Sequence, residues 1–292
     1  MTVPADPDPA HAGSGSLDRL DEWEGCCAED LAREWAVPEV EILRSVGSTN
    51  DVAKTLAADG APECTVVLAE RQDAGRGRAG RVWSSPPGLG LYLSVIARPD
   101  ATKASIYPLR SAVAVAQALD PWTARKVAVK WPNDLLLHGR KLGGILCEAT
   151  WKGGSIANLI VGVGVNVLHR TEDFPPQLRD GAVSLRSASG GPSDSTAVSR
   201  FQVASSVVRS ICAMIRDRFT SQTSTEWRAE LDRRDALVGE RVDVFEPESG
   251  RLVIASGRAE GIAEDGALMI RQNGAVVSIR SGTIRFAGDR PA

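Results

Sequence analysis

The segment Gly75–Arg81, with the sequence GRGRAGR, is the feature that most limits how this chain can fold. Its three arginines and three glycines cannot pack into a core, so it must form a loop between the apolar run 64–68 and Trp83. Glycine lets the backbone approach a ligand closely, and guanidinium groups bind phosphate or carboxylate oxygens in pairs. The loop is therefore predicted to bind an anion and to be mobile without one. A solvated linker or a nucleic-acid patch has a similar composition, so the loop alone is not specific.

Composition narrows the class of protein. The length of 292 residues suits one large domain, or one large and one small domain. A net charge of -3 argues against nucleic-acid binding through bulk charge. The 5 cysteines are scattered and odd in number, which favours reduced thiols over a disulfide framework. No apolar run reaches the length of a membrane span, and the N-terminus lacks the pattern of a secretory signal, so a cytoplasmic protein is expected.

The order of predicted elements favours an α+β fold, an open mixed sheet with helices against it, because strands and helices do not alternate regularly. Residues 1–16 predict a disordered tail, and 174–192 a loop. Ser48 followed by Asp51 predicts a capping box. Helices are expected at 17–35, 48–58, 102–119, 196–219 and 224–234, and strands at 40–46, 65–70, 90–98, 127–131, 142–149 and 155–167.

The sequence pattern changes at about Val238, after which it predicts a succession of short strands and turns. Strands are expected at 241–245, 252–259, 268–270 and 275–279, which together make a small all-β module, interpreted as a barrel. The chain is thus divided into a domain at 17–236 and a second at 237–292. A helix-turn-helix needs two helices, and one short helix dominates the residues before Val40, so no DNA-binding domain is expected.

Two further segments change the interpretation of the arginine loop. The first is KWPND at 130–134, followed by RKLGGIL at 140–146, and the second is GVGVNV at 162–167. Together with 75–83, and in this order, they resemble the catalytic domain of biotin protein ligases. The resemblance runs from about Val46 to the C-terminus. It implies a mixed-sheet catalytic domain of the biotin/lipoate protein ligase type, followed by a Src-homology-3-like C-terminal barrel.

The chemistry of such a ligase suits these residue types. Joining a carboxylic acid to an amine requires an activated acyl group, which forms when the carboxylate attacks the α-phosphate of ATP. Both reactants are anionic, so the site must screen their charge and hold them in line. Arg76, Arg78, Arg81 and Lys141 are suited to this task. No nucleophile from the protein is required, and a closing loop would keep water from the adenylate.

The resemblance also implies roles for individual residues. Lys141 and Arg78 are the predicted catalytic residues. Magnesium would be held mainly by the phosphates, and no protein ligand is assigned to it. The predicted biotin-binding residues are Ser48, Thr49, Asn50, Gln72, Arg76, Gly77, Arg78, Lys141, Gly143 and Gly144. The predicted ATP- and adenylate-binding residues are Arg78, Arg81, Trp83, Asn133, Asp134, Lys141 and Asn166.

Several alternatives remain open. Ser48 could simply cap a helix, Asn133-Asp134 could be a plain turn, and Gly162 and Gly164 could serve close packing. His138 and His169 are expected at the surface, and Ala79 stands where some relatives carry a basic residue. A lipoate–protein ligase and a regulator that senses biotinyl-AMP are the competing functions. The expected partner is a biotin carboxyl carrier domain, with acetyl-CoA carboxylase its usual owner. The expected assembly is a monomer or homodimer.

Overall fold

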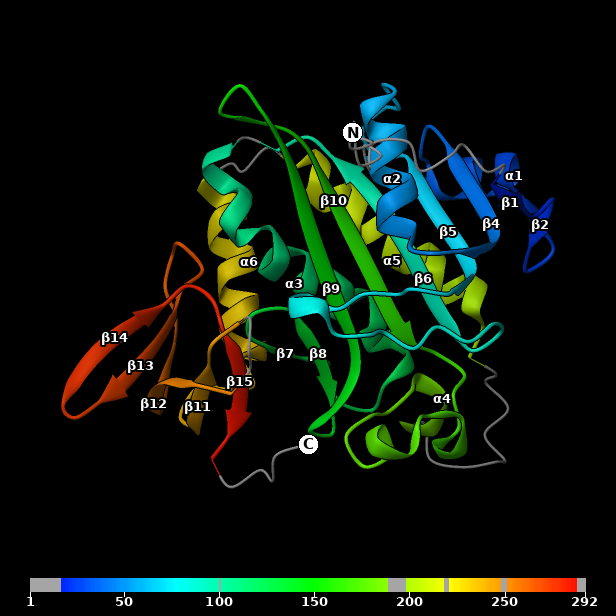
Figure 1. Ribbon diagram of the computed structural model, residues 1–292. Coiled ribbons are helices and arrows are strands. Elements are labelled where there is room, and N and C mark those ends of the chain that lie inside the picture. Colours follow the sequence, from blue (N-terminus) through cyan, green and yellow to red (C-terminus); the bar gives the residue numbers. More distant parts are fainter. Residues whose placement is uncertain (1–16, 100, 189–197, 218–220, 248–250, 288–292) are drawn as a thin grey trace, which may run out of the picture.

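The computed structural model describes residues 17–99, 101–188, 198–217, 221–247 and 251–287. The predicted tail at 1–16 lies outside the described residues. Within them the chain forms an eight-stranded sheet flanked by helices, and a separate five-stranded sheet built from the C-terminal segment (Figure 1). The α+β prediction is confirmed, and so is the small all-β module, an antiparallel sheet of the kind expected for a Src-homology-3-like module.

The main sheet has the strand order β1-β4-β5-β6-β10-β9-β8-β7. Its strands are β1 (Asp18–Arg19), β4 (Val40–Val46), β5 (Val66–Gln72), β6 (Gly90–Ala97), β10 (Ser155–Asn166), β9 (Arg140–Lys152), β8 (Asp134–Leu137) and β7 (Ala128–Lys130). Only β4 and β5 pair in parallel among these strands, because the helix α2 (Thr49–Ala58) carries the chain back between them. The strands expected at 142–149 and 155–167 are confirmed as β9 and β10, which form a hairpin with Gly153 and Gly154 at its turn.

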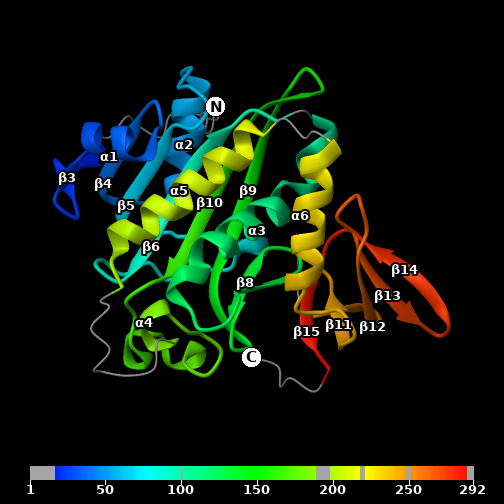
Figure 2. The same ribbon diagram turned by 180° about the vertical axis from the view of Figure 1, so that it is seen from behind.

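Helices cover the two faces of the main sheet unequally. α2 packs on one face, against β5, β6 and β10. The opposite face carries α1 (Ala28–Trp35), α3 (Tyr107–Leu119), α5 (Arg200–Arg216) and α6 (Ser221–Arg234), as the view from behind shows (Figure 2). The larger core lies under these helices, whereas a small cluster that includes Leu43, Ala53 and Ile160 lies under α2. The face with α2 therefore has room for a cavity beside the helix.

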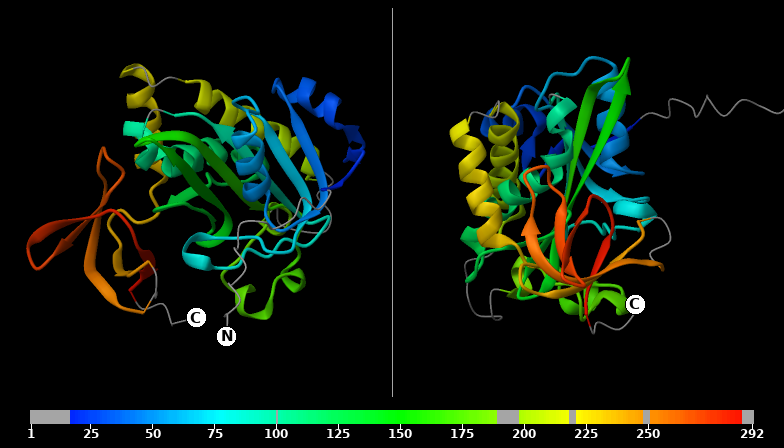
Figure 3. Two further views of the ribbon diagram at one scale, coloured as in Figure 1. Left: turned by 45° about the horizontal axis from the view of Figure 1, so that its top comes forward. Right: turned by 90° about the vertical axis from the view of Figure 1, so that its left-hand side faces the viewer.

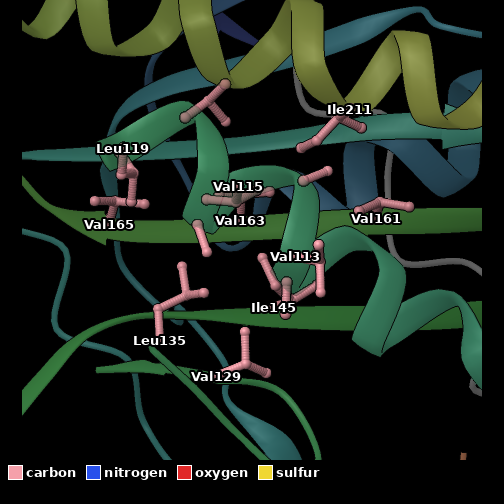
Figure 4. Close-up of a cluster of buried hydrophobic side chains, with 14 of the residues drawn as sticks. Val113, Val115, Leu119, Val129, Leu135, Ile145, Val161, Val163, Val165 and Ile211 are labelled. Carbon is pink, nitrogen blue, oxygen red and sulfur yellow. The ribbon is translucent and has the colours of Figure 1, made fainter. Parts of the chain in front are cut away.

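Strand β10 shows why the two faces differ. Val161, Val163 and Val165 point into the larger core, where they lie near α3 and α5 (Figure 4). Each fully buried side chain of this kind contributes roughly 1.5–3 kcal/mol. The residues between them, Gly162 and Gly164, face the other side because side chains alternate along a strand. The same strand thus supplies core packing on one face and bare backbone on the other.

The predicted helix at 17–35 is wrong in its first half. The structure has a small hairpin of β2 (Glu22–Trp23) and β3 (Cys26–Cys27), and the helix α1 begins only at Ala28. Glu24 and Gly25 form the two-residue turn with φ of 51° and 78°. Positive φ at both positions is the type I′ geometry that joins antiparallel strands. The helical spacing of apolar residues did not take account of this turn.

Other boundaries also differ from expectation. A 3-10 helix at Ala101–Ile106 precedes α3, and strand β8, which was not predicted, begins at Asp134. The expected loop at 174–192 contains a 3-10 helix at Pro176–Leu178 and the short helix α4 (Leu185–Ala188), while its residues beyond 188 lie outside the described part of the chain. His138 is exposed as expected, but His169 is buried and stacks on Phe174, so its predicted surface position is wrong.

The C-terminal sheet has the order β14-β13-β12-β11-β15. Its strands are β11 (Arg241–Phe245), β12 (Val253–Ile262), β13 (Leu268–Gln272), β14 (Ala275–Ile279) and β15 (Thr283–Phe286), the last of which was not predicted. The sheet stands beside the main sheet instead of continuing it (Figure 3). Trp131 connects the two parts, because its Nε1 donates a hydrogen bond of 2.9 Å to the Gly266 carbonyl. The domain boundary at 236/237 stays a prediction.

Candidate active site

A cavity of about 320 Å³ opens on the side of the main sheet that carries α2. Its walls come from the start of α2, the glycines of β10, the beginning of β9, the KWPND segment and the start of β15. The arginine loop after β5 closes it, and in Figure 1 this loop (cyan) crosses in front of β9 and β10. Segments far apart in the sequence thus meet at one site.

The start of α2 is held by Gln72 at the end of β5. Ser48 is the N-cap residue of α2, and its own backbone is extended. Its side chain makes no capping hydrogen bond, so the predicted capping box is wrong. Instead, Gln72 Oε1 accepts hydrogen bonds from the Thr49 backbone N–H at 2.9 Å and from Thr49 Oγ1 at 3.1 Å. A side chain from strand β5 therefore accepts the hydrogen bond of a backbone N–H that the helix leaves unpaired.

Asn50 is the centre of a buried polar cluster. Ser94 Oγ donates to Asn50 Oδ1 at 2.6 Å, and Asn50 Nδ2 donates to Glu148 Oε2 at 2.5 Å. Burial opposes ionisation of Glu148, but the hydrogen bonds from Asn50 and Lys54 hold the pKa of this carboxyl below its usual range. The cluster requires a glycine behind it, because a β-carbon at Gly162 would lie 2.3 Å from Asn50 Oδ1. Its polar atoms are thus oriented by their mutual bonds before any ligand binds.

The three arginines of the loop have different environments. Arg76 makes a two-point ion pair with Asp51, with N–O distances of 2.7 and 2.6 Å, and this pair holds the pKa of Asp51 below its usual range. Burial lowers the pKa of Arg78; the Asp134 carboxylate opposes this shift and the charge of Arg81 adds to it. Arg81 Nη2 donates a hydrogen bond of 2.7 Å to Thr283 Oγ1. Arg78 and Arg81 form no ion pair within the part of the chain that the structure describes.

Lys141, at the start of β9, also lines the cavity. Its Nζ is 2.7 Å from Asp134 Oδ1 and 5.5 Å from the centre of the Trp83 ring. A carboxylate on one side and an aromatic face on the other hold the ammonium group in one place. Nearby, Asn133 Nδ2 donates to the Ile145 carbonyl at 2.6 Å, which ties the KWPND segment to β9.

Nearly all the predicted site residues line this cavity, with two exceptions. Gly143 does not, because it faces the other side of the sheet, where a β-carbon would lie 2.7 Å from the Gly164 carbonyl. Asn166 does not either, since its Nδ2 donates to the carbonyls of Lys141 at 3.3 Å and Val183 at 3.1 Å. Asn166 therefore positions the backbone of Lys141, which is a structural contact that the spacing of residues could not show.

Sequence reasoning missed the contribution of the C-terminal sheet to the cavity. Gly282, Thr283 and Ile284 line it, although no motif distinguishes them and β15 was not expected. Leu93 and Leu146 add apolar wall, and Leu178 comes from the loop before α4. The cavity thus joins a cationic end, with Arg78, Arg81 and Lys141, to an end with apolar walls and a polar cluster. Such a site can bind an anion and, beside it, an apolar molecule with a polar head group.

Comparison with known proteins agrees with this description. The Biotin/lipoate A/B protein ligase family matches residues 42–166. A biotin–[acetyl-CoA-carboxylase] ligase of Mycobacterium tuberculosis is 31% identical over 84% of this chain and 88% of its own length. A Paracoccus denitrificans protein of the same name is 30% identical over 85% of this chain and 100% of its own length. The biotin protein ligase from Aquifex aeolicus in complex with biotin and ATP has a TM-score of 0.69 and 27% identity, covering 85% of this chain and 99% of that one.

Fold, cavity and matched segment together define a protein of the biotin/lipoate ligase class. Within that class the chain belongs to the biotin protein ligase family. The chain also matches the bifunctional ligase/repressor BirA of Bacillus spizizenii with 42% identity, but it spans only about half, 48%, of that relative's length. Within the described residues, no helix is long and apolar enough to cross a membrane.

Proposed function

We propose that this protein activates biotin with ATP as biotinyl-5′-AMP and transfers the biotinyl group to a lysine of a biotin carboxyl carrier domain. The observation that carries the proposal is the arrangement of Arg78, Arg81 and Lys141 in one cavity with the Asn50 polar cluster. A relative of the same fold is a biotin protein ligase in complex with biotin and ATP. Cations at one end suit phosphates, and the polar cluster suits a ureido head group that needs several hydrogen-bond partners.

The first step joins two anions. A carboxylate oxygen of biotin attacks the α-phosphorus, the bond to the β-phosphate oxygen breaks, and pyrophosphate leaves with the electron pair. Arg78 and Lys141 both line the cavity, so they would hold the carboxylate and the α-phosphate together as charge builds. The Asp134 carboxylate keeps the Lys141 ammonium in position, at 2.7 Å. No protein nucleophile takes part.

The second step uses the neutral amine of the acceptor lysine. Its nitrogen attacks the acyl carbon, AMP leaves with the electrons of the carbon–oxygen bond, and the nitrogen loses a proton to solvent. The arginine loop would keep water from the mixed anhydride until the acceptor arrives. This role agrees with the contacts that close the loop on itself, where Gly77 N donates to the Arg81 carbonyl at 2.7 Å and Trp83 N to the Gly75 carbonyl at 2.8 Å.

Magnesium fits this site as an ion that arrives on the triphosphate. Asp134 is the single carboxylate among the described residues that line the cavity, and it already pairs with Lys141. Magnesium usually keeps several waters and binds one or two carboxylates plus substrate phosphates, which matches this donor set. When bound, the ion would screen the phosphate charge. Asp134 is the carboxylate of this lining that could help to hold it.

The proposal extends to partners and location. The acceptor is a biotin carboxyl carrier domain, as the names of the relatives that act on acetyl-CoA carboxylase suggest. A cytoplasmic location suits the free state of all the cysteines and the need for ATP. Action as a monomer or homodimer, without nucleic acid, stays a prediction; a gel-shift with tight, sequence-specific DNA binding would contradict the latter part.

Pyrophosphate release tests the proposal directly. Purified protein is mixed with ATP, magnesium and either biotin or lipoate, and labelling of a carrier domain is followed in parallel. Release and labelling with biotin alone are the expected result. Activity with lipoate alone would overturn the assignment of the polar cluster to biotin while leaving the activation chemistry in place. No pyrophosphate release and no labelling with either acid would contradict the ligase assignment and favour a protein that only senses the adenylate.

A further inference from the structure

The C-terminal sheet holds one arginine of the arginine loop through a single hydroxyl. Arg81 Nη2 donates to Thr283 Oγ1 at 2.7 Å, a contact between residues 202 positions apart. We propose that Thr283 is a positioning residue for ATP, which holds the Arg81 guanidinium at the phosphate end of the cavity. This inference rests on the proposed ATP-dependent activity and assigns a function to the C-terminal sheet within it.

The charges around Arg81 explain why a neutral partner matters. Arg76 is neutralised by Asp51, whereas Arg78 and Arg81 form no ion pair within the described ranges. The charge of Arg81 also helps to lower the pKa of Arg78, so the two guanidinium groups repel each other. A hydroxyl can fix Arg81 in this place without cancelling its charge, and it uses one of five N–H donors. The others remain for phosphate oxygens.

Thr283 is suited to act as an anchor because its own position is well determined. It is the first residue of β15 and pairs with Phe245 of β11. A β-carbon at the preceding Gly282 would lie 2.5 Å from Val244 Cγ1, so the backbone before Thr283 packs directly against β11. The hydrogen bond from Trp131 Nε1 to Gly266 at 2.9 Å docks the sheet on the KWPND segment. The rigid partner is thus the C-terminal sheet, and the movable one is the loop.

Thr283→Val tests the contact, since valine keeps the volume and removes the hydroxyl. The KM for ATP at saturating biotin should rise roughly three- to tenfold, as expected for the loss of one ordinary hydrogen bond, because solvent weakens a contact at this exposed position. The KM for biotin should not change. Thr283→Ser keeps the hydroxyl and should restore the wild-type KM for ATP, while Thr283→Ala should behave as the valine variant does. Melting curves confirm that all three variants fold.

A double-mutant cycle shows whether Thr283 acts through Arg81. Arg81→Ala should raise the KM for ATP, and adding Thr283→Val should raise it no further, because the second change removes a bond already lost. Additive effects, an equal rise in the KM for biotin, or a wild-type KM in Thr283→Val would each overturn the inference while leaving the ligase assignment intact. Absence of pyrophosphate release by the wild-type protein with biotin would instead remove the proposed function on which the inference rests.

Discussion

The indole ring of Trp83 rests on the bare backbone of Gly164. A β-carbon at position 164 would lie 2.6 Å from Trp83 Cε2 and 2.7 Å from its Nε1, closer than real β-carbons approach other atoms. The indole N–H is buried and has no hydrogen-bond partner among the described residues. Lys141 Nζ lies over the same ring, 5.5 Å from its centre. The location of the ring, and with it a wall of the cavity, therefore depends on glycine in β10.

Gly164→Ala should displace the Trp83 ring from the cavity wall. The backbone at 164 has no positive φ, so alanine is tolerated by the strand and the fold should survive. We expect a loss of at least roughly tenfold in kcat/KM for pyrophosphate release, because misplacing one wall of a site by about 1 Å commonly costs more than that. Tryptophan fluorescence and steady-state kinetics measure the displacement and its effect.

Gly47→Ala is the matched control for this prediction. It also lies beside the cavity, next to Ser48, but a β-carbon there meets no atom within 4 Å. Its kinetics should stay near those of the wild-type protein. If Gly164→Ala and Gly47→Ala were equally active, the contact between the ring and β10 would have no role in the reaction.

Lys141→Met should strongly slow adenylate formation without unfolding the protein. The side chain contributes charge at the cavity and little core packing, and its removal should lower the rate of pyrophosphate release about 10²- to 10³-fold. The neighbouring Arg140→Met is the control, because it removes a similar charge from β9 at a residue that does not line the cavity. Wild-type release by the Lys141 variant would remove that residue from the mechanism.

The loop Gly75–Arg81 should exchange its amide hydrogens faster without ligands than with biotin and ATP. Ala79 has a left-handed φ of 54° and the loop has few anchors outside itself, chiefly Arg76 to Asp51 and Arg81 to Thr283. Bound phosphates would add further anchors and protect the amides. Hydrogen exchange with mass spectrometry measures this difference. Strong protection in the free protein would contradict the prediction that the loop is mobile.

The sequence was sufficient where local patterns and the fold agree. Alternating valines in 161–167 indicated a strand with one buried face, and the structure places them in the core. The arginine loop could be located because its composition excludes a core, and Lys141 because a family motif carries it. These signals are contained in short segments, and so no tertiary contact is needed to interpret them.

Contacts between distant segments could not be predicted in this way. Thr283 has no local feature that marks it as part of the cavity, and Gln72 holds the start of α2 from another strand. The turn at Glu24-Gly25 was not predicted, because the apolar residues around it have an apparent helical spacing. Gly25 was the local signal that could have indicated it. His169 was placed at the surface because burial of a lone histidine depends on what packs over it.

His169 should make the protein less stable as the pH falls below neutrality. It is buried against Phe174, with ring centres 4.9 Å apart, and burial lowers its pKa from 6.5 to about 4. Between these values the unfolded chain binds a proton that the folded protein does not, so unfolding becomes more favourable as the pH decreases. From pH 7 to pH 5 this histidine should cost about 2 kcal/mol of the free energy of unfolding. Urea titrations at several pH values measure it.

His169→Phe isolates this contribution, since phenylalanine can stack on Phe174 and does not titrate. Between pH 7 and pH 5 the variant should lose roughly 2 kcal/mol less of its free energy of unfolding than the wild-type protein. Carboxylates such as Glu70 and Glu148 have pKa values below their usual range in the folded protein. They stabilise the fold at pH values above the pKa of the same groups in the unfolded chain, and this stabilisation is lost only as the pH falls below that value. Their effect therefore falls outside this window. If the free energy of unfolding of the two proteins changed equally between pH 7 and pH 5, the pKa of His169 would not be lowered in the folded protein.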